Sequence, residues 1–177
     1  MTQRILVALD LLEPDVFETA LSLATATHAD LLLLHVLSAR AFSAPPVPFG
    51  SRMDYSVALS QHTWELYQKQ WQAFVEESLE TLRTYTGRAE VAGVNADFMQ
   101  SENEPGPGIC SMASTWNADM IVMGSHQRRG LSELFLGSVS NYVMHHAPCS
   151  VMVVSLGKEE NSKAKRSSKS SQKVAAA

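Results

Sequence analysis

The 177-residue sequence lacks the features that would place a protein in a membrane or outside the cell. Its longest apolar run, around Leu31–Leu34, is broken by His35 and falls far short of the about 20 residues that cross a bilayer. The first residues show no long hydrophobic segment with a small-residue cleavage site, so we expect no secretory signal. These absences predict a cytoplasmic protein without a membrane partner.

Cysteine is scarce as well. Cys110 and Cys149 are too few for a disulfide framework, and they lack the CxxC spacing of many redox and zinc sites. We therefore predict two reduced and mostly buried thiols, as is usual in the cytosol.

Charge is unevenly distributed along the chain, although the net charge is only −4. Residues 158–177 contain six Lys/Arg and two Glu and carry +4, which leaves −8 on residues 1–157. An acidic body argues against nucleic acid as a partner of the folded part. The basic tail has no aromatic residue and cannot bury enough apolar surface to stay ordered. We predict one domain over residues 1–157 and a flexible basic tail over residues 158–177.

Apolar runs alternate with helical patterns from the N-terminus onward. Continuous apolar runs are typical of strands buried on both faces, and apolar residues at helical spacing indicate the helices between them. Strands separated in this way pair in parallel through right-handed crossovers. The sequence therefore predicts an α/β fold, an open parallel five-stranded sheet with helices on both faces. The expected strands are residues 5–9, 31–36, 91–98, 120–124 and 151–154; the expected helices are residues 14–24, 57–85 (ended by Gly87), 108–115 and 137–146, with a loop at 38–55.

Ligands of open α/β sheets bind beyond the carboxyl ends of the strands, where the strand order reverses. Asp10 and Gly124 end two predicted strands, and Gly137-Ser138 opens a predicted helix. A helix N-terminus offers unpaired N–H groups and partial positive charge to a phosphate. On these residues alone, however, a capping Ser138 and a turn at Gly137 are the stronger interpretation. Asp10 could likewise be an ordinary turn residue.

Several stretches together resemble the universal stress protein family, whose fold is Rossmann-like. They cover most of residues 4–156: Ile5–Asp10, Leu32–Val36, Ala118–Gly124, Met123–His126, Gly137–Ser140 and His146–Val151. The ATP-binding branch of that family carries Gly, two residues, Gly, nine residues, then Gly-Ser or Gly-Thr. Gly124 and Gly137-Ser138 match this pattern, but Gln127 replaces the middle glycine. That glycine would let the backbone lie close to the phosphates.

The resemblance implies an adenine nucleotide, ATP or AMP, with or without Mg²⁺. It places Asp10 near the ribose or a metal-bound phosphate, with Ala8 and Leu9 beside it. It places the backbone of Val36 at the adenine. The implied phosphate side contains Met123, Gly124, Gly137, Ser138 and Val139, and the loop between them contributes His126, Gln127, Arg128 and Arg129.

The resemblance also implies a homodimer through residues Val151–Val154, a short apolar strand whose free edge invites pairing. Three functions stay open: a nucleotide-binding regulatory protein of the stress response, a weak ATPase, and a dimeric interaction module that has lost nucleotide binding and contacts an unknown protein. The sequence has no GxxxxGK[ST] or GxSxG motif, so we expect slow hydrolysis at most. His35 is expected to be a hydrogen-bonded core histidine. The aromatic residues Trp64, Tyr67, Trp71 and Phe74 are expected in a core or an interface.

Overall fold

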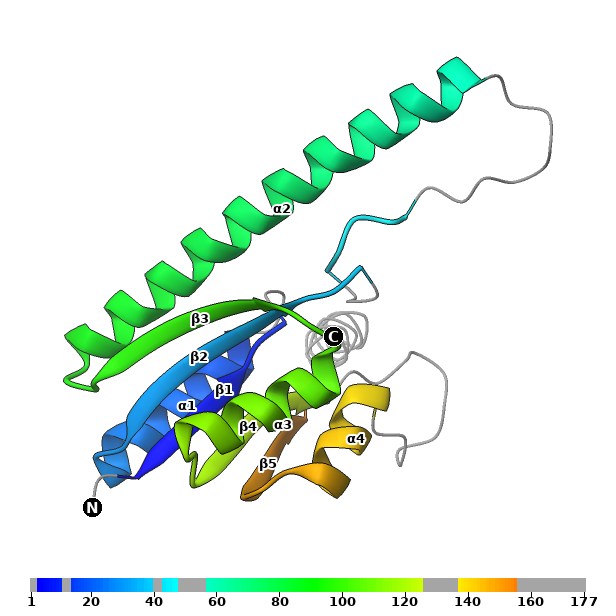
Figure 1. The fold of residues 1–177 in the computed structure, drawn as a ribbon. Helices are drawn as coiled ribbons and strands as arrows, with labels where there is room; N and C mark the ends of the chain where they lie inside the picture. Colours follow the sequence, from blue (N-terminus) through cyan, green and yellow to red (C-terminus); the bar gives the residue numbers. More distant parts are fainter. Residues whose placement is uncertain (1–2, 11–13, 40–42, 48–56, 126–136, 156–177) are drawn as a thin grey trace, which may run out of the picture.

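The computed structural model describes residues 3–10, 14–39, 43–47, 57–125 and 137–155. Strands and helices alternate along them, as the sequence predicts (Figure 1). In chain order the elements are β1 (Arg4–Ala8), α1 (Pro14–Thr27), β2 (Asp30–Leu37), α2 (Val57–Val91), β3 (Ala96–Glu102), α3 (Pro105–Trp116), β4 (Met120–Ser125), α4 (Ser138–His146) and β5 (Ser150–Ser155).

The strands of this described part form one parallel sheet in the order β3-β2-β1-β4-β5. The chain moves outward from β1 through β2 to β3, then crosses to β4 on the other side of β1 and moves outward again to β5. Helices α1 and α2 pack on one face, and α3 and α4 pack on the other. Parallel crossovers are right-handed, so helices that move the chain toward β3 and helices that move it toward β5 must lie on opposite faces of the sheet. The predicted α/β class and the five-stranded parallel sheet are confirmed.

Alternating side chains of the central strands fill two separate apolar layers, because successive residues of a strand point to opposite faces. In β1, Ile5 and Val7 pack with Phe17 and Leu82 beneath α1 and α2. Leu6 packs on the other face, in the layer beneath α3 and α4. Apolar residues are therefore needed at every position of β1, which explains its continuous apolar run.

Helix α2 packs on the rest of the fold through its C-terminal half. Near its C-terminus, Tyr85 stacks on Phe17 of α1 with ring centroids 4.2 Å apart. Arg88 lies 5.0 Å above the centre of the Phe17 ring and bonds Glu18 at 2.7 Å. The N-terminal part of α2 extends beyond the carboxyl ends of the strands (Figure 1), and Trp64 in that part is 51% exposed.

The boundary between α2 and β3 differs from the prediction. The helix continues through Gly87 to Val91, and the strand begins at Ala96 rather than at residue 91. Ala89 is fully buried while Val91 is 92% exposed, so the helical periodicity persists to the end of this segment. The turn uses Gly93 instead, whose φ of +79° suits glycine, and Val94 N donates to Ala89 O.

The start of α3 also differs from the prediction, because the helix begins at Pro105 instead of residue 108. Proline fits the first turn of a helix, where its missing N–H would have no intrahelical partner. The early start brings Gly106 against Tyr142 of α4.

His35 is a buried polar residue of β2 on the face covered by α2, and its side chain is 1% exposed. Its ring makes an edge contact with Phe74 of α2, with centroids 5.7 Å apart. The expected burial is confirmed, but the expected hydrogen bonding is wrong, since neither ring nitrogen has a partner among the described residues. Burial lowers the pKa of His35, and the nearby negative charge of Asp10 offsets part of that effect.

Two glycines in helices should respond oppositely to alanine. Gly87→Ala should raise the free energy of unfolding by about 0.5–1 kcal/mol, because its new Cβ meets no atom within 4 Å. Gly106→Ala should lower it by about 1–3 kcal/mol, because its Cβ would lie 2.7 Å from Tyr142 Cδ1. Urea denaturation measures both. A Gly106→Ala protein as stable as the parent would contradict the contact, and adding Tyr142→Ala should relieve the clash.

A buried neutral His35 should make stability depend on pH. The unfolded chain binds a proton near the ordinary histidine pKa of 6.5, while the folded chain binds it only at lower pH. Stability should therefore fall as the pH drops below 6.5, by at most about 1.4 kcal/mol per pH unit from this residue. His35→Leu should remove this contribution. Urea unfolding at pH 7.5 and about 5.5 tests it, and an unchanged pH dependence in the variant would refute the assignment.

Candidate functional site

The reversal of strand order places the carboxyl ends of β1 and β4 side by side. Ala8 of β1 pairs with Met123 of β4, so Leu9 and Asp10 emerge next to Gly124. Leu9 N donates to Leu34 O of β2 at 2.9 Å, which holds the chain beyond the end of β1. The structure thus brings these predicted site residues to one edge of the sheet.

Val36 lies at the same edge. Ala8 pairs with Leu34, so Val36, two residues further along β2, reaches about the level of Asp10. Its side chain is buried in the layer beneath α3 and α4, close to Gly108. The backbone of β2 therefore lies on one side of Asp10, and β4 lies on the other.

Asp10 supplies negative charge at this edge. The residue is half-buried, and its Oδ1 atom is shielded from solvent. Its charge is close enough to favour protonation of His35. Sequence reasoning missed this proximity of Asp10 and His35. The sequence held one signal of this proximity: His35 directly precedes Val36, which we expected at the nucleotide site.

The N-terminus of α4 provides the opposite polarity. Gly137 is the N-cap residue, with extended backbone (φ −60°, ψ 161°), and Ser138 is the first helical residue. Because Gly137 occupies the cap position, the interpretation of Ser138 as the cap is wrong. The side chain of Ser138 is exposed. A glycine cap has no side chain that could accept a hydrogen bond from the first-turn N–H groups. Those N–H groups and the helix dipole suit an external anion.

The remaining hydroxyl groups of the site are tied to the backbone. Ser140 Oγ donates to Gly137 O at 3.0 Å, inside the first turn of α4. Ser125 Oγ, at the end of β4, donates to Val154 O at 3.4 Å. Val139 is half-buried and packs on the layer beneath α3 and α4. The start of α4 is thus fixed by packing and by local hydrogen bonds.

Some predictions lie outside the described residues. They concern the phosphate-side loop, with His126, Gln127, Arg128 and Arg129. The predicted end of the domain at residue 157 and the predicted tail at 158–177 also lie outside the described residues.

Within the described ranges, no group of three or more His, Cys, Asp or Glu side chains could hold a metal ion. Asp10 as a contact for nucleotide-bound Mg²⁺ therefore stays a prediction.

Three other expectations can be compared with the described residues. Cys110 and Cys149 are free and half-buried, and burial raises the pKa of both thiols. None of the described helices is long and apolar enough to cross a membrane. Strand β5 is an edge strand, with its Val151–Val154 residues half-buried, as the dimer hypothesis needs. The dimer itself stays a prediction.

Comparison with known proteins supports one family. The model of the universal stress protein family matches residues 1–155. Universal stress protein Sll1388 of Synechocystis sp. is 33% identical over 156 residues, which cover 85% of this chain and 96% of that protein.

Solved structures share the fold. Universal stress protein UspA from Lactobacillus plantarum aligns with a TM-score of 0.62 at 24% identity, covering 86% of this chain and 97% of its own. A family protein from Arabidopsis thaliana with AMP bound aligns with a TM-score of 0.56 at 20% identity, covering 89% of this chain and 94% of its own. Other structures of this fold are complexes with dAMP and with cAMP. Together with the family model, these matches show that the chain belongs to the universal stress protein family.

Proposed function

We propose that this chain is a regulatory protein that binds an adenine nucleotide, ATP or AMP, at the edge between β1 and β4. The observation that carries the proposal is the convergence of three features. A half-buried carboxylate (Asp10) and a glycine one residue before the end of β4 (Gly124) lie close together at the reversal of strand order. A helix with a glycine cap, α4, follows β4 in the chain. Reversal points of parallel sheets are the usual ligand sites of this class of fold.

Each element has a distinct role in this proposal. The first-turn N–H groups of α4, at Ser138 and Val139, would donate to the phosphates. Gly124 would let the chain pass close to them. Asp10 would contact the ribose hydroxyls or a phosphate-bound Mg²⁺, and the backbone of Val36 would contact the adenine. The AMP, dAMP and cAMP complexes of proteins with this fold support an adenine nucleotide as the ligand class.

A binding role is favoured over efficient catalysis. Hydrolysis needs a positioned base or nucleophile, and the hydroxyls of Ser125 and Ser140 donate to backbone carbonyls instead. We therefore propose that nucleotide binding changes the conformation or the partner of the protein, with slow ATP hydrolysis at most.

A second candidate function is a homodimeric interaction module without nucleotide. Two observations favour it: Gln127 replaces a glycine of the ATP-binding pattern, and β5 ends the sheet as an apolar edge strand. In that case the dimer would present its surface to another protein.

The nucleotide proposal predicts that adenine nucleotide copurifies with the protein and is released on denaturation, where mass spectrometry identifies it. Calorimetric titration of the stripped protein with Mg-ATP should give a micromolar Kd. Asp10→Asn should weaken binding about tenfold or more, because it removes a charge-assisted contact. Asp97→Asn, which neutralises an exposed carboxylate of β3 far from the site, is the matched control and should not change it.

No released nucleotide and no heat signal at millimolar ATP would overturn the proposal and favour the interaction module. Phosphate release measured in the same samples separates binding from hydrolysis. We expect turnover too slow for a dedicated ATPase.

The dimer proposal predicts that Val153→Glu dissociates the protein. A charge in the middle of β5 opposes the burial of an apolar strand against a second copy. Sedimentation velocity should show a monomer for the variant and a dimer for the parent protein. Because Val153 also packs on the layer beneath α3 and α4, circular dichroism must confirm that the variant is folded. A folded Val153→Glu protein that remains dimeric would refute pairing through β5.

A further inference from the structure

A row of aromatic rings runs along one side of α2, from the core to the part of the helix that extends beyond the sheet. Neighbouring rings are separated by 5.7 Å (Trp64–Tyr67), 6.3 Å (Tyr67–Trp71) and 5.6 Å (Trp71–Phe74). Residues three and four positions apart share one side of a helix, which explains the row. Phe74 is buried against His35, whereas Trp71 and Tyr67 are only partly covered.

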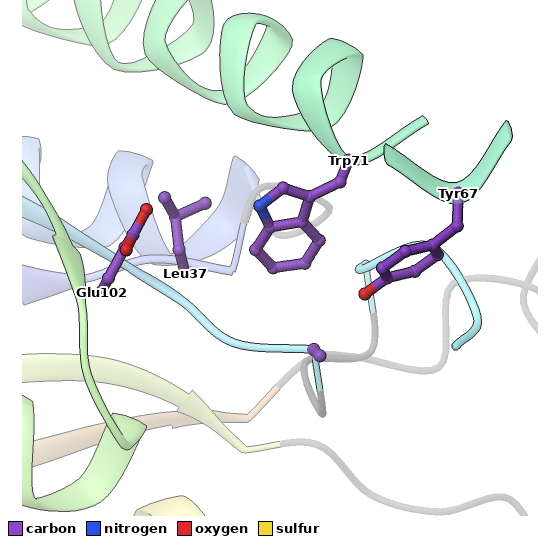
Figure 2. Close-up of a pocket in the computed structure, with 5 residues that line it drawn as sticks. Leu37, Tyr67, Trp71 and Glu102 are labelled. Atoms are coloured by element: carbon purple, nitrogen blue, oxygen red, sulfur yellow. The ribbon is translucent and has the colours of Figure 1, made fainter. Parts of the chain in front are cut away.

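Beneath the middle of this row lies a pocket of about 270 Å³ between α2 and the carboxyl ends of β2 and β3. It is lined by Leu37, Ala39, Tyr67, Trp71 and Glu102. Figure 2 shows the rings of Trp71 and Tyr67 pointing from α2 toward the strands, while Leu37 and the Glu102 carboxylate point from the strands toward α2. In this view Leu37 and Trp71 lie between Glu102 and Tyr67, so Trp71 is the aromatic ring on the side of the carboxylate.

Among the described residues that line the pocket, Glu102 is the only charged one. The residues of α2 three or four positions from Tyr67 and Trp71 are uncharged as well: Thr63, Trp64, Gln68, Gln70, Phe74 and Val75. The described lining therefore carries negative charge, and Glu102 would repel an anionic ligand.

A carboxylate beside partly covered indole and phenol rings is suited to a cation. Ring faces carry partial negative charge, and the attraction strengthens when the rings are shielded from water. We propose that this pocket binds a small organic cation of the alkylammonium class, with the charged nitrogen between the Trp71 ring and the Glu102 carboxylate. The volume lies just below the range of about 300–1,000 Å³ that accommodates drug-sized ligands, so the ligand must be small.

This pocket adjoins the proposed nucleotide site, because Leu37 directly follows Val36, but the two sites share no assigned residue. The pocket is covered by α2 rather than by α4. Binding of an alkylammonium ion can therefore be measured whether or not the protein binds nucleotide.

The first test compares choline with its neutral isostere, in which carbon replaces the charged nitrogen. Calorimetry gives the affinities, and the part of the tryptophan fluorescence change that Trp71→Leu removes reports the environment of Trp71 among the three tryptophans. Choline should bind at least fivefold more tightly than the isostere, because only the cation interacts with the ring faces and the carboxylate. Its affinity should fall with added salt, because Glu102 is exposed and its attraction is screened.

Variants locate the site. Glu102→Gln should weaken choline binding about fivefold or more, and Trp71→Leu should abolish the measured heat. Asp97→Asn removes the same charge from the same strand and should leave binding unchanged. Glu102 is exposed, so its variant should fold normally, which urea denaturation checks. Equal affinity for choline and the isostere, equal loss in the Glu102 and Asp97 variants, or no binding at millimolar choline would each overturn the proposal.

Discussion

The pairing of β1 with a parallel strand on each side is the constraint on which the rest of this structure depends. Because β2 and β4 both pair with β1, the strand is sealed at both edges and buried on both faces. Helices must then cover both sides of the sheet, and the chain must reverse direction across it. Where it reverses, the described helices that follow β1 and β4 lie on opposite faces of the sheet, α1 on one face and α4 on the other. Asp10 and the end of β4 lie there because of that topology.

The same topology separates the two sites that we propose. On one side of the molecule, the α4 N-terminus follows the reversal point and supplies positive polarity that suits phosphate. On the other side, α2 is anchored near its C-terminus by Phe17 and Arg88 and extends past the sheet. This extension leaves aromatic rings partly covered above the ends of β2 and β3, beside an acidic residue. The carboxyl ends of the strands thus carry both proposed sites. The anion site is formed with α4, and the cation site is formed with α2.

The sequence predicted the sheet and most helices because buried parallel strands are continuous apolar runs, and such runs are easily recognised. It failed where a local signal conflicted with packing. Gly87 suggested a helix end, but buried Ala89 shows that the apolar side of α2 still contacts the core beyond it. His35 was correctly expected in the core, yet its missing hydrogen bonds and its proximity to Asp10 depend on pairing between distant strands. The pocket of Trp71 and Glu102 was beyond prediction for the same reason.

The central claim, that the β1–β4 edge and the start of α4 hold a nucleotide, is tested most directly by amide chemical shifts in heteronuclear NMR during AMP titration. The account predicts that the largest changes occur at the amides of Ser138, Val139 and Asp10, with small changes at β3. Changes confined to α2 or β5, or a spectrum that AMP leaves unaltered, would contradict it.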